Sequence, residues 1–412
     1  DSDRVPDEHT IARVASVTKT FTTTAVLQLR DEGKLHLDDP LVKHIPEFAS
    51  VKVGFGTVED VTLRRLLTHH SGLVTEPPTP GWDVLQFPTR EEILGHLKET
   101  EIVIPQDSGW KYSNLAFALL GEVVHRVSGE PYTEYVRTQI FEPLGLTSSV
   151  FDLTADLEPR FFVGYNPTPF QDFPEQAPYA HLMGLTPAGQ LHSTVSDLAR
   201  WVSFQFQKDG GKRNGAQVLD GRTLAEIQRP QYIVPDWSSG QCLGWRATRV
   251  GDRVYHSHGG GIHGFATQVM FNAPGKTGGI QFINMWPAPG GQELIQEVLE
   301  MVLDQEARPS GATSLTPTPE HLKRFLGFYR AEPGIGVQVE FRQGDLRLAV
   351  PDGAQYSLHA PCVLKATEDE GKWLVEGGRG AGETAVFNFA EDGRVMGYEL
   401  GAFVFQKQEV VS

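Results

Sequence analysis

The chain has 412 residues, 40% of them hydrophobic, so it is long enough to bury a large core and to form two or three domains. Its 52 acidic and 36 basic residues give a formal net charge of -16, which disfavours binding to nucleic acid or to an anionic membrane. The two cysteines, Cys242 and Cys362, are distant in sequence and exclude a disulfide framework and a close-paired metal or redox site.

No apolar run approaches the roughly 18 residues that a membrane-spanning helix needs, so we expect a soluble chain. The first residue is Asp1 rather than methionine, and no signal-peptide pattern follows it. We therefore expect a processed or trimmed chain, from which an export signal could already have been removed. The sequence leaves the cellular compartment of the protein open.

The first predicted element is a helix that begins at Ser16. An apolar residue recurs at every fourth position from Val17 to Leu29, and Gly33 is typical of a helix C-terminus. Ser16 and Lys19 share one face of this helix. A buried lysine can accept the serine proton or lower the pKa of another base, and a helix N-terminus offers N–H groups to an oxyanion. Ser16 is therefore a candidate nucleophile.

The Ser-x-x-Lys pattern is not specific by itself, because Ser108 and Lys111 repeat it. That second pair lies in a predicted loop, where nothing fixes the lysine. Threonines crowd residues 18–24 and favour strands over helices, so the first helix must be held by packing on several sides. The alternative for Ser16 is a structural N-cap with a lysine in solvent.

Two side-chain pairs in residues 66–87 have ordinary explanations. His69 and His70 would diverge on a helix and lack a third ligand at suitable spacing, so we expect a structural role rather than a metal site. Trp82 and Phe87 lie in a Pro-rich loop and either line a substrate cleft or cover the helical region.

Tyr112 and Asn114 precede an apolar helix predicted over residues 115–127. In an extended turn, residues two apart point the same way, so the phenol and the carboxamide can enter one cleft. Tyr112 could act as a general base beside Lys19, and Asn114 could bind a substrate amide or hold Lys19. The alternative is a packed tyrosine with Asn114 as a helix cap. A further helix is predicted over residues 196–206.

Residues 253–271 read as a strand, three glycines and a second strand. Glycines allow close approach of a ligand, so an N–H group of Gly260 or Gly261 could complete an oxyanion hole with the amide of Ser16. His258 would then flank the cleft as a neutral or switchable donor. A plain hairpin turn is one alternative; a phosphate cradle is the other, but no helix follows. Which nearby histidine faces the cleft stays open among His256, His258 and His263.

The clearest boundary is a Pro/Ser/Thr-rich linker at residues 307–320. Residues 321–412 then alternate apolar and polar residues in short runs, with turn signals at Gly344–Asp345 and Asp392–Gly393. This pattern predicts a small antiparallel meander or barrel. The preceding part mixes helices with short strands and has no internal repeat.

Three motifs in order resemble the serine β-lactamase and penicillin-binding protein superfamily, particularly the class C β-lactamase-like branch with its esterases and D-aminopeptidases. They are Ser-Val-Thr-Lys at 16–19, Tyr-Ser-Asn at 112–114 and His-Gly-Gly at 258–260. The stretch "LLTHHSGL" at 66–73 and the region around residues 112–146 match as well. The resemblance covers roughly residues 8–300.

This resemblance implies an α+β fold for residues 1–306, with an antiparallel sheet flanked by helices and a helical subdomain, followed by a lipocalin-like β-barrel. It implies that Ser16 is acylated, that Lys19 and Tyr112 share proton transfer, and that Asn114 positions both Lys19 and the substrate. The amides of Ser16 and Gly261 would form the oxyanion hole.

The chain departs from the family pattern at two places. His258 stands where β-lactamases and DD-peptidases usually have lysine, so a fixed charge for a substrate carboxylate is missing, as in esterases and D-aminopeptidases. Only fifteen residues precede Ser16, whereas the family builds a helix and strands first. Without those strands a sheet edge would be unpaired, so we expect an N-terminal segment that is either missing or separately retained, after cleavage, to complete the sheet.

The sequence therefore predicts a serine hydrolase without metal or cofactor, acting through an acyl-enzyme on ester or amide and peptide bonds. Its partner would be a small-molecule or short-peptide substrate, and the oligomeric state, with a homo-oligomer among the options, stays open. One alternative is a sensor that is acylated with little turnover. Another is a non-catalytic structural relative.

Overall fold

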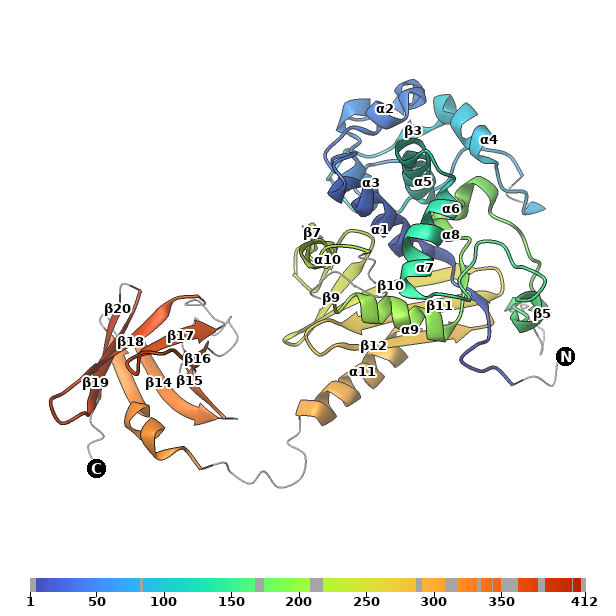
Figure 1. The fold of residues 1–412 in the computed structure, drawn as a ribbon. Coiled ribbons are helices and arrows are strands. Elements are labelled where there is room, and N and C mark those ends of the chain that lie inside the picture. The colour runs from blue at the N-terminus through green and yellow to red at the C-terminus, as the bar shows by residue number, and fades with distance from the viewer. Residues whose placement is uncertain are drawn as a thin grey trace. The chain divides into compact units, whose positions relative to one another are not determined.

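The computed structural model describes residues 5–81, 84–166, 174–207, 218–286, 291–307, 317–331, 335–342, 344–349, 362–376, 382–401 and 403–408. The chain divides into two compact units, Asp1–Ala307 and Arg308–Ser412 (Figure 1). Most of the predicted linker, residues 308–316, lies outside the described part of the chain.

The first unit is built on a six-stranded antiparallel sheet with the strand order β12-β11-β10-β9-β8-β7. Its strands are β7 (Tyr232–Ile233), β8 (Ser239–Gln241), β9 (Arg246–Val250), β10 (Arg253–Ile262), β11 (Phe265–Asn272) and β12 (Thr277–Ile283). Three two-stranded sheets join β1 (Ala12–Arg13) to β6 (His192–Ser193), β2 (Lys52–Val53) to β3 (Glu101–Ile102), and β4 (Tyr165–Asn166) to β5 (Glu175–Gln176). Among the described strands, β12 pairs only with β11.

Helices surround this sheet (Figure 1). They are α1 (Thr18–Asp31), α2 (Leu41–His44), α3 (Leu63–Leu67), α4 (Arg90–Gly95), α5 (Asn114–Ser128), α6 (Tyr132–Val136), α7 (Glu142–Leu144), α8 (Thr186–Gly189), α9 (Val195–Phe204), α10 (Gly221–Ile227) and α11 (Gly291–Ala307). The predicted helices at 115–127 and 196–206 correspond to α5 and α9 within two residues at each end. Among the described residues, no helix combines the length and apolar character needed to cross a membrane.

Helices cover both faces of the sheet. A side chain on Gly278 would meet Val202 of α9, whereas one on Gly279 would meet Ile295 of α11. Because neighbouring residues of a strand point to opposite faces, α9 and α11 lie on opposite sides of β12. The larger core fills the α9 side, where α1 and α5 also lie, and a smaller cluster with Tyr255 packs under α11.

Helix α1 is central and buried, as its composition predicted. Every residue from Thr18 to Leu29 is buried. The threonine hydroxyls find acceptors inside the protein: Thr23 donates to the Lys19 carbonyl, and Thr22 donates to the Pro187 carbonyl at 2.7 Å. These bonds offset the cost of placing β-branched polar residues in a buried helix.

The second unit is a closed antiparallel barrel of eight strands. Its strands are β13 (Gly327–Ala331), β14 (Ile335–Arg342), β15 (Asp345–Ala349), β16 (Cys362–Ala366), β17 (Lys372–Glu376), β18 (Thr384–Phe389), β19 (Val395–Leu400) and β20 (Phe403–Lys407). Pairing of Tyr329 with Lys407 closes the ring. The barrel and the predicted hairpins are therefore confirmed, while the lipocalin-like assignment stays a prediction.

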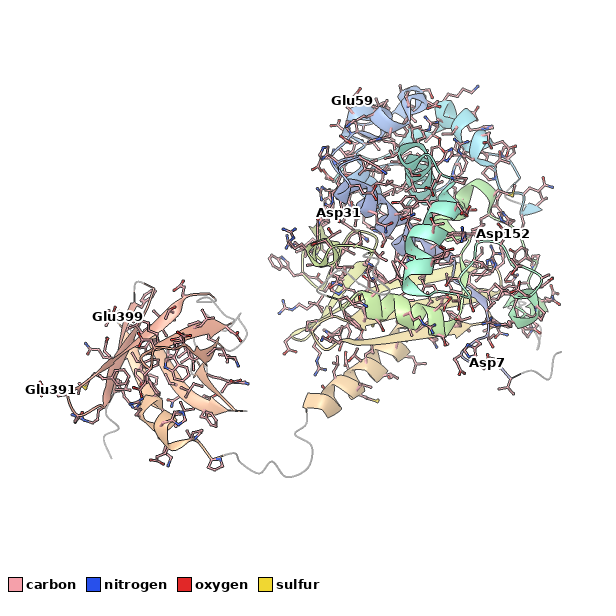
Figure 2. All side chains as sticks on the ribbon, in the orientation of Figure 1. Asp7, Asp31, Glu59, Asp152, Glu391 and Glu399 are labelled. Carbon is pink, nitrogen blue, oxygen red and sulfur yellow. The ribbon has the colours of Figure 1, made fainter. Side chains whose placement is uncertain are left out.

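Acidic side chains lie at the surface of both units. Figure 2 labels six of them, all exposed: Asp7, Asp31, Glu59, Asp152, Glu391 and Glu399. These six carboxylate residues are thus presented to solvent.

Candidate active site

Ser16 lies in a 3-10 turn, Ala15–Val17, that leads into α1. The α-helix itself begins at Thr18, two residues later than the sequence predicted. Between Thr10 and Leu29, Ser16 is the one residue that is not buried. Ala15 has a φ of 46°, a left-handed conformation that costs a non-glycine residue on the order of 1–3 kcal/mol and that concentrates at functional sites.

Lys19 is fully buried and its ammonium makes three hydrogen bonds. Nζ donates to Ser16 Oγ at 3.2 Å, to Asn114 Oδ1 at 2.7 Å and to the Ala188 carbonyl at 2.6 Å. Burial lowers the pKa of Lys19 to about 7, against an attraction to Glu76 that raises it. A lysine with this pKa is partly neutral near pH 7 and can then accept a proton.

Tyr112 contacts the same oxygen atom. Its hydroxyl donates to Ser16 Oγ at 2.8 Å, and its ring lies 4.9 Å from Lys19 Nζ. Burial raises the pKa of Tyr112 above its ordinary value, so this tyrosine stays protonated at neutral pH. Two groups from distant parts of the sequence thus converge on Ser16 Oγ.

Asn114 is the first residue of α5 and links Lys19 to a carboxylate. Its Oδ1 accepts from Lys19, and its Nδ2 donates to Glu76 Oε1 at 2.6 Å. The helix cap is Ser113, whose side chain accepts from the Ala116 amide. The alternative in which Asn114 caps the helix is therefore wrong, and its side chain is free to enter the site.

The three glycines do not form a turn between two strands. They continue β10, which runs to Ile262, and Gly260 pairs with Thr267 of β11. The reason is close packing: a Cβ atom on Gly260 would lie 2.2 Å from the Val14 carbonyl oxygen, and one on Gly261 would lie 2.1 Å from Trp286 Nε1. Strand β10 therefore passes directly beside the segment that carries Ser16.

The histidines of this strand lie in different surroundings. His256 stacks on Phe271 in the core at 5.2 Å, whereas His258 is close enough to Lys19 for their charges to interact. Burial, and then Lys19, lowers the pKa of His258 to about 4, so the ring is neutral at pH 7. Its Nδ1 donates to the Gly259 carbonyl at 2.7 Å, which leaves Nε2 as an acceptor. His263 lines the cleft that contains Ser16.

His69 supports the tyrosine, which the sequence did not reveal. Its backbone has a left-handed φ of 59°. Its Nδ1 accepts from the Ser113 amide at 3.1 Å, and its ring lies 4.4 Å from that of Tyr112. Burial holds the pKa of His69 well below its usual range. Among the described residues, no group of three or more potential metal ligands is found.

The second Ser-x-x-Lys pair does not come together. Ser108 is exposed and donates to the Pro105 carbonyl, whereas Lys111 Nζ donates to Thr75 Oγ1 at 2.6 Å. This pair therefore provides neither a base hydrogen-bonded to Ser108 nor a buried lysine. Context, rather than pattern, distinguishes Ser16.

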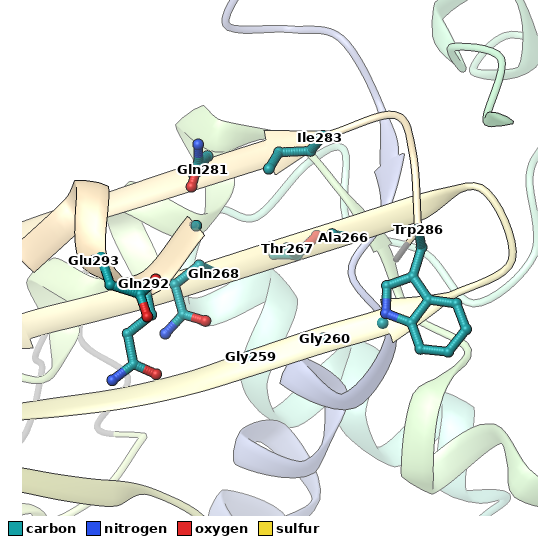
Figure 3. Close-up of a pocket in the computed structure, with 12 residues that line it drawn as sticks. Gly259, Gly260, Ala266, Thr267, Gln268, Gln281, Ile283, Trp286, Gln292 and Glu293 are labelled. Carbon is teal, nitrogen blue, oxygen red and sulfur yellow. The ribbon is translucent and has the colours of Figure 1, made fainter. Parts of the chain in front are cut away.

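Ser16 opens into a cavity of about 270 Å³. Its lining includes Ser16, Glu76, Phe87, Asn114, Gly261, His263 and Trp286. Phe87 therefore lines the cleft, while Trp82 lies outside the described residues. Trp286 also borders a second cavity, of about 360 Å³, along β10, β11 and β12 (Figure 3).

Comparison with known proteins identifies the family. The model of the Beta-lactamase family matches residues 2–302, and the chain belongs to this family. It is 30% identical over 274 residues to Beta-lactamase-like protein 2 of Dictyostelium discoideum, covering 65% of this chain and 48% of that protein. The chain thus spans about half the length of that relative.

A bacterial relative and a solved structure carry hydrolase names. The chain is 31% identical over 272 residues to the D-alanyl-D-alanine-carboxypeptidase/endopeptidase AmpH of Escherichia coli strain K12, covering 64% of this chain and 68% of that protein. The structure of a D-stereospecific amidohydrolase from Streptomyces sp. is similar, with 25% identity and a TM-score of 0.58, and the match covers 72% of this chain and 88% of the amidohydrolase chain. The α+β fold predicted for the first unit is confirmed by these likenesses.

Proposed function

We propose that the protein is a serine hydrolase that cleaves ester or amide bonds through an acyl-enzyme on Ser16. The observation that carries this proposal is the convergence of Lys19 Nζ, at 3.2 Å, and the Tyr112 hydroxyl, at 2.8 Å, on a serine oxygen that opens into a cavity. A nucleophile within hydrogen-bond reach of a base is the arrangement that acyl transfer requires.

Lys19 is the better candidate for the base. Its lowered pKa, about 7, leaves an appreciable neutral fraction at neutral pH, whereas the raised pKa of Tyr112 disfavours a tyrosinate. Neutral Lys19 would take the Ser16 proton during attack on the carbonyl carbon. Tyr112 would give its proton to the leaving group and recover one from Lys19.

The developing oxyanion would be held by backbone amides. We assign these to Ser16, in the turn that leads into α1, and to Gly261 on β10, with Gly260 keeping the strand close to the Val14 carbonyl. Asn114 would orient Lys19 and the substrate. His258 would border the substrate site as a neutral acceptor rather than as a cation.

Turnover distinguishes a hydrolase from a protein that is acylated but does not release the acyl group. We would offer an activated ester, a D-alanyl amide and a penicillin separately, and follow both product release and the intact mass. A hydrolase releases product from at least one of them in excess of the enzyme, and Ser16→Ala abolishes this. A persistent adduct with less than one equivalent of product would instead establish a sensor that is acylated without turnover. Turnover by Ser16→Ala would contradict the assignment of Ser16 as the nucleophile.

A further inference from the structure

Glu76 is a carboxylate inside the cleft that the proposed chemistry does not use. It lies in the loop after α3 and is half buried. The loop is fixed at this point, because the Thr75 carbonyl accepts from the backbone amides of Asn114 and Leu115 at 2.8 and 3.1 Å. Glu76 is therefore held beside Asn114, in the cavity that contains Ser16.

Only one of its two carboxylate oxygens is satisfied. Oε1 accepts from Asn114 Nδ2 at 2.6 Å. Oε2 is shielded from solvent, and within the described residues no group hydrogen-bonds to it. Buried polar atoms are nearly always paired, so an unpaired carboxylate oxygen on a residue that lines the cleft is a signal of an absent partner.

In the described part of the chain, the two cations that interact with Glu76 are Lys19 and Lys111, and both donate to other acceptors. In its charged form, Lys19 Nζ donates to Ser16, Asn114 and the Ala188 carbonyl, which uses all three of its protons. Lys111 Nζ donates to Thr75 Oγ1 at 2.6 Å. Among the described residues, no ion pair reaches the Glu76 carboxylate. Desolvation raises the pKa of Glu76 despite the opposing hydrogen bond from Asn114 and the charges of the two lysines.

The rest of the cleft disfavours a substrate carboxylate. His258 is neutral at pH 7 and presents an acceptor, so no fixed positive charge stands at the third motif. A cationic ligand would instead meet Glu76, and pairing would recover the cost of burying its charge. The charge pattern of the site thus matches an ammonium group.

Resting on the proposed function, we infer that Glu76 is a specificity-determining residue that binds the free α-ammonium group of an aminoacyl substrate through its carboxylate, one oxygen of which is unpaired. In such a substrate the amine is one carbon removed from the carbonyl that Ser16 attacks. It must therefore lie among the residues that surround Ser16, where Asn114 places the carboxylate. The substrate class is amino-acid esters, amides or peptides with an unblocked amino terminus.

The test compares free and blocked amines in three forms of the protein. Substrates are D- and L-alanine methyl ester and their N-acetyl derivatives, with the product acid measured by mass spectrometry. The variants are Glu76→Gln, which keeps an acceptor for Asn114, and Glu59→Gln, which removes an exposed charge that is not among the residues lining the cleft (Figure 2). Thermal unfolding of each variant checks that the fold is kept.

We expect wild type to prefer the free amine by roughly tenfold or more in kcat/KM, the size of a charge-assisted hydrogen bond. Glu76→Gln should lower this preference roughly tenfold, mainly through KM, and Glu59→Gln should not change it. Equal rates for free and blocked esters, or an unchanged preference in Glu76→Gln, would overturn the inference. If neither ester is hydrolysed although a fluorophosphonate still labels Ser16, the inference alone is overturned. If Ser16 is not labelled either, the proposed function is rejected.

Discussion

Burial distinguishes Ser16 from the other hydroxyl groups of its segment. The neighbouring threonines are buried and donate to carbonyls, whereas Ser16 Oγ receives hydrogen bonds from Lys19 and Tyr112 and faces a cavity. The same burial that isolates Lys19 from water lowers its pKa to about 7. Burial of Lys19 therefore determines both the reactivity of Ser16 and the pH at which that reactivity develops.

This cause predicts a pH dependence. Because the pKa of Lys19 is lowered, its neutral, proton-accepting form predominates above pH 7 rather than only above its ordinary pKa of about 10.4. The kcat/KM for an activated ester should rise about tenfold per pH unit below pH 7 and level off above it. A stopped-flow profile from pH 5 to 9 would measure this. A rate that keeps rising up to pH 9 without levelling off would show that Lys19 keeps an ordinary pKa.

Tyr112→Phe removes a single hydrogen bond to Ser16 Oγ while keeping the ring against His69. We expect kcat to fall by roughly 10²–10⁴, the usual contribution of a positioned proton donor, with little change in thermal stability. Steady-state kinetics and calorimetry on the same sample would separate the two effects. Retention of full activity would show that Tyr112 takes no part in proton transfer.

Strand β10 and the segment that leads into helix α1 position the site together. Their close approach depends on Gly260, where a side chain would meet the Val14 carbonyl oxygen at 2.2 Å. Backbone cannot yield as a flexible side chain does, so the strand and the segment before Ser16 would have to separate. The oxyanion hole that we propose spans this contact.

Gly260→Ala should therefore destabilise the first unit by about 1–3 kcal/mol, the usual cost of overpacking, and slow acylation of Ser16. Gly95→Ala is the matched control, because a Cβ atom there meets nothing within 4 Å. Urea unfolding and the rate of fluorophosphonate labelling would be measured for both. Labelling of Gly260→Ala at the wild-type rate would place the oxyanion hole elsewhere.

At the scale of the whole molecule, each unit has its own hydrophobic cluster. Trp373 belongs to the barrel cluster, against Phe325 at 5.3 Å. Trp373→Ala should destabilise the barrel by about 3–5 kcal/mol and leave labelling of Ser16 unchanged. Calorimetry should show that the unfolding transition of the barrel moves to lower temperature while that of the first unit stays constant. A loss of labelling would reveal that the active unit depends on the barrel.

Local patterns made much of this arrangement predictable. The stripe after Ser16 predicted α1, and the ordered motifs predicted that Lys19, Tyr112 and Asn114 meet at one serine. Glu76 and His69 were not predicted as members of the site, since a single carboxylate or imidazole in a loop has no periodic signal and acquires its role from tertiary contacts. The glycines of β10 were misread as a break because glycine usually interrupts strands, whereas here backbone packing requires them.

The identity of the nucleophile can be tested most directly by intact-mass measurement after treatment with a fluorophosphonate. Wild type and Ser108→Ala, which alters the second Ser-x-x-Lys pair, should each gain one adduct. Ser16→Ala should gain none. An adduct on Ser16→Ala, or no adduct on wild type, would contradict the account.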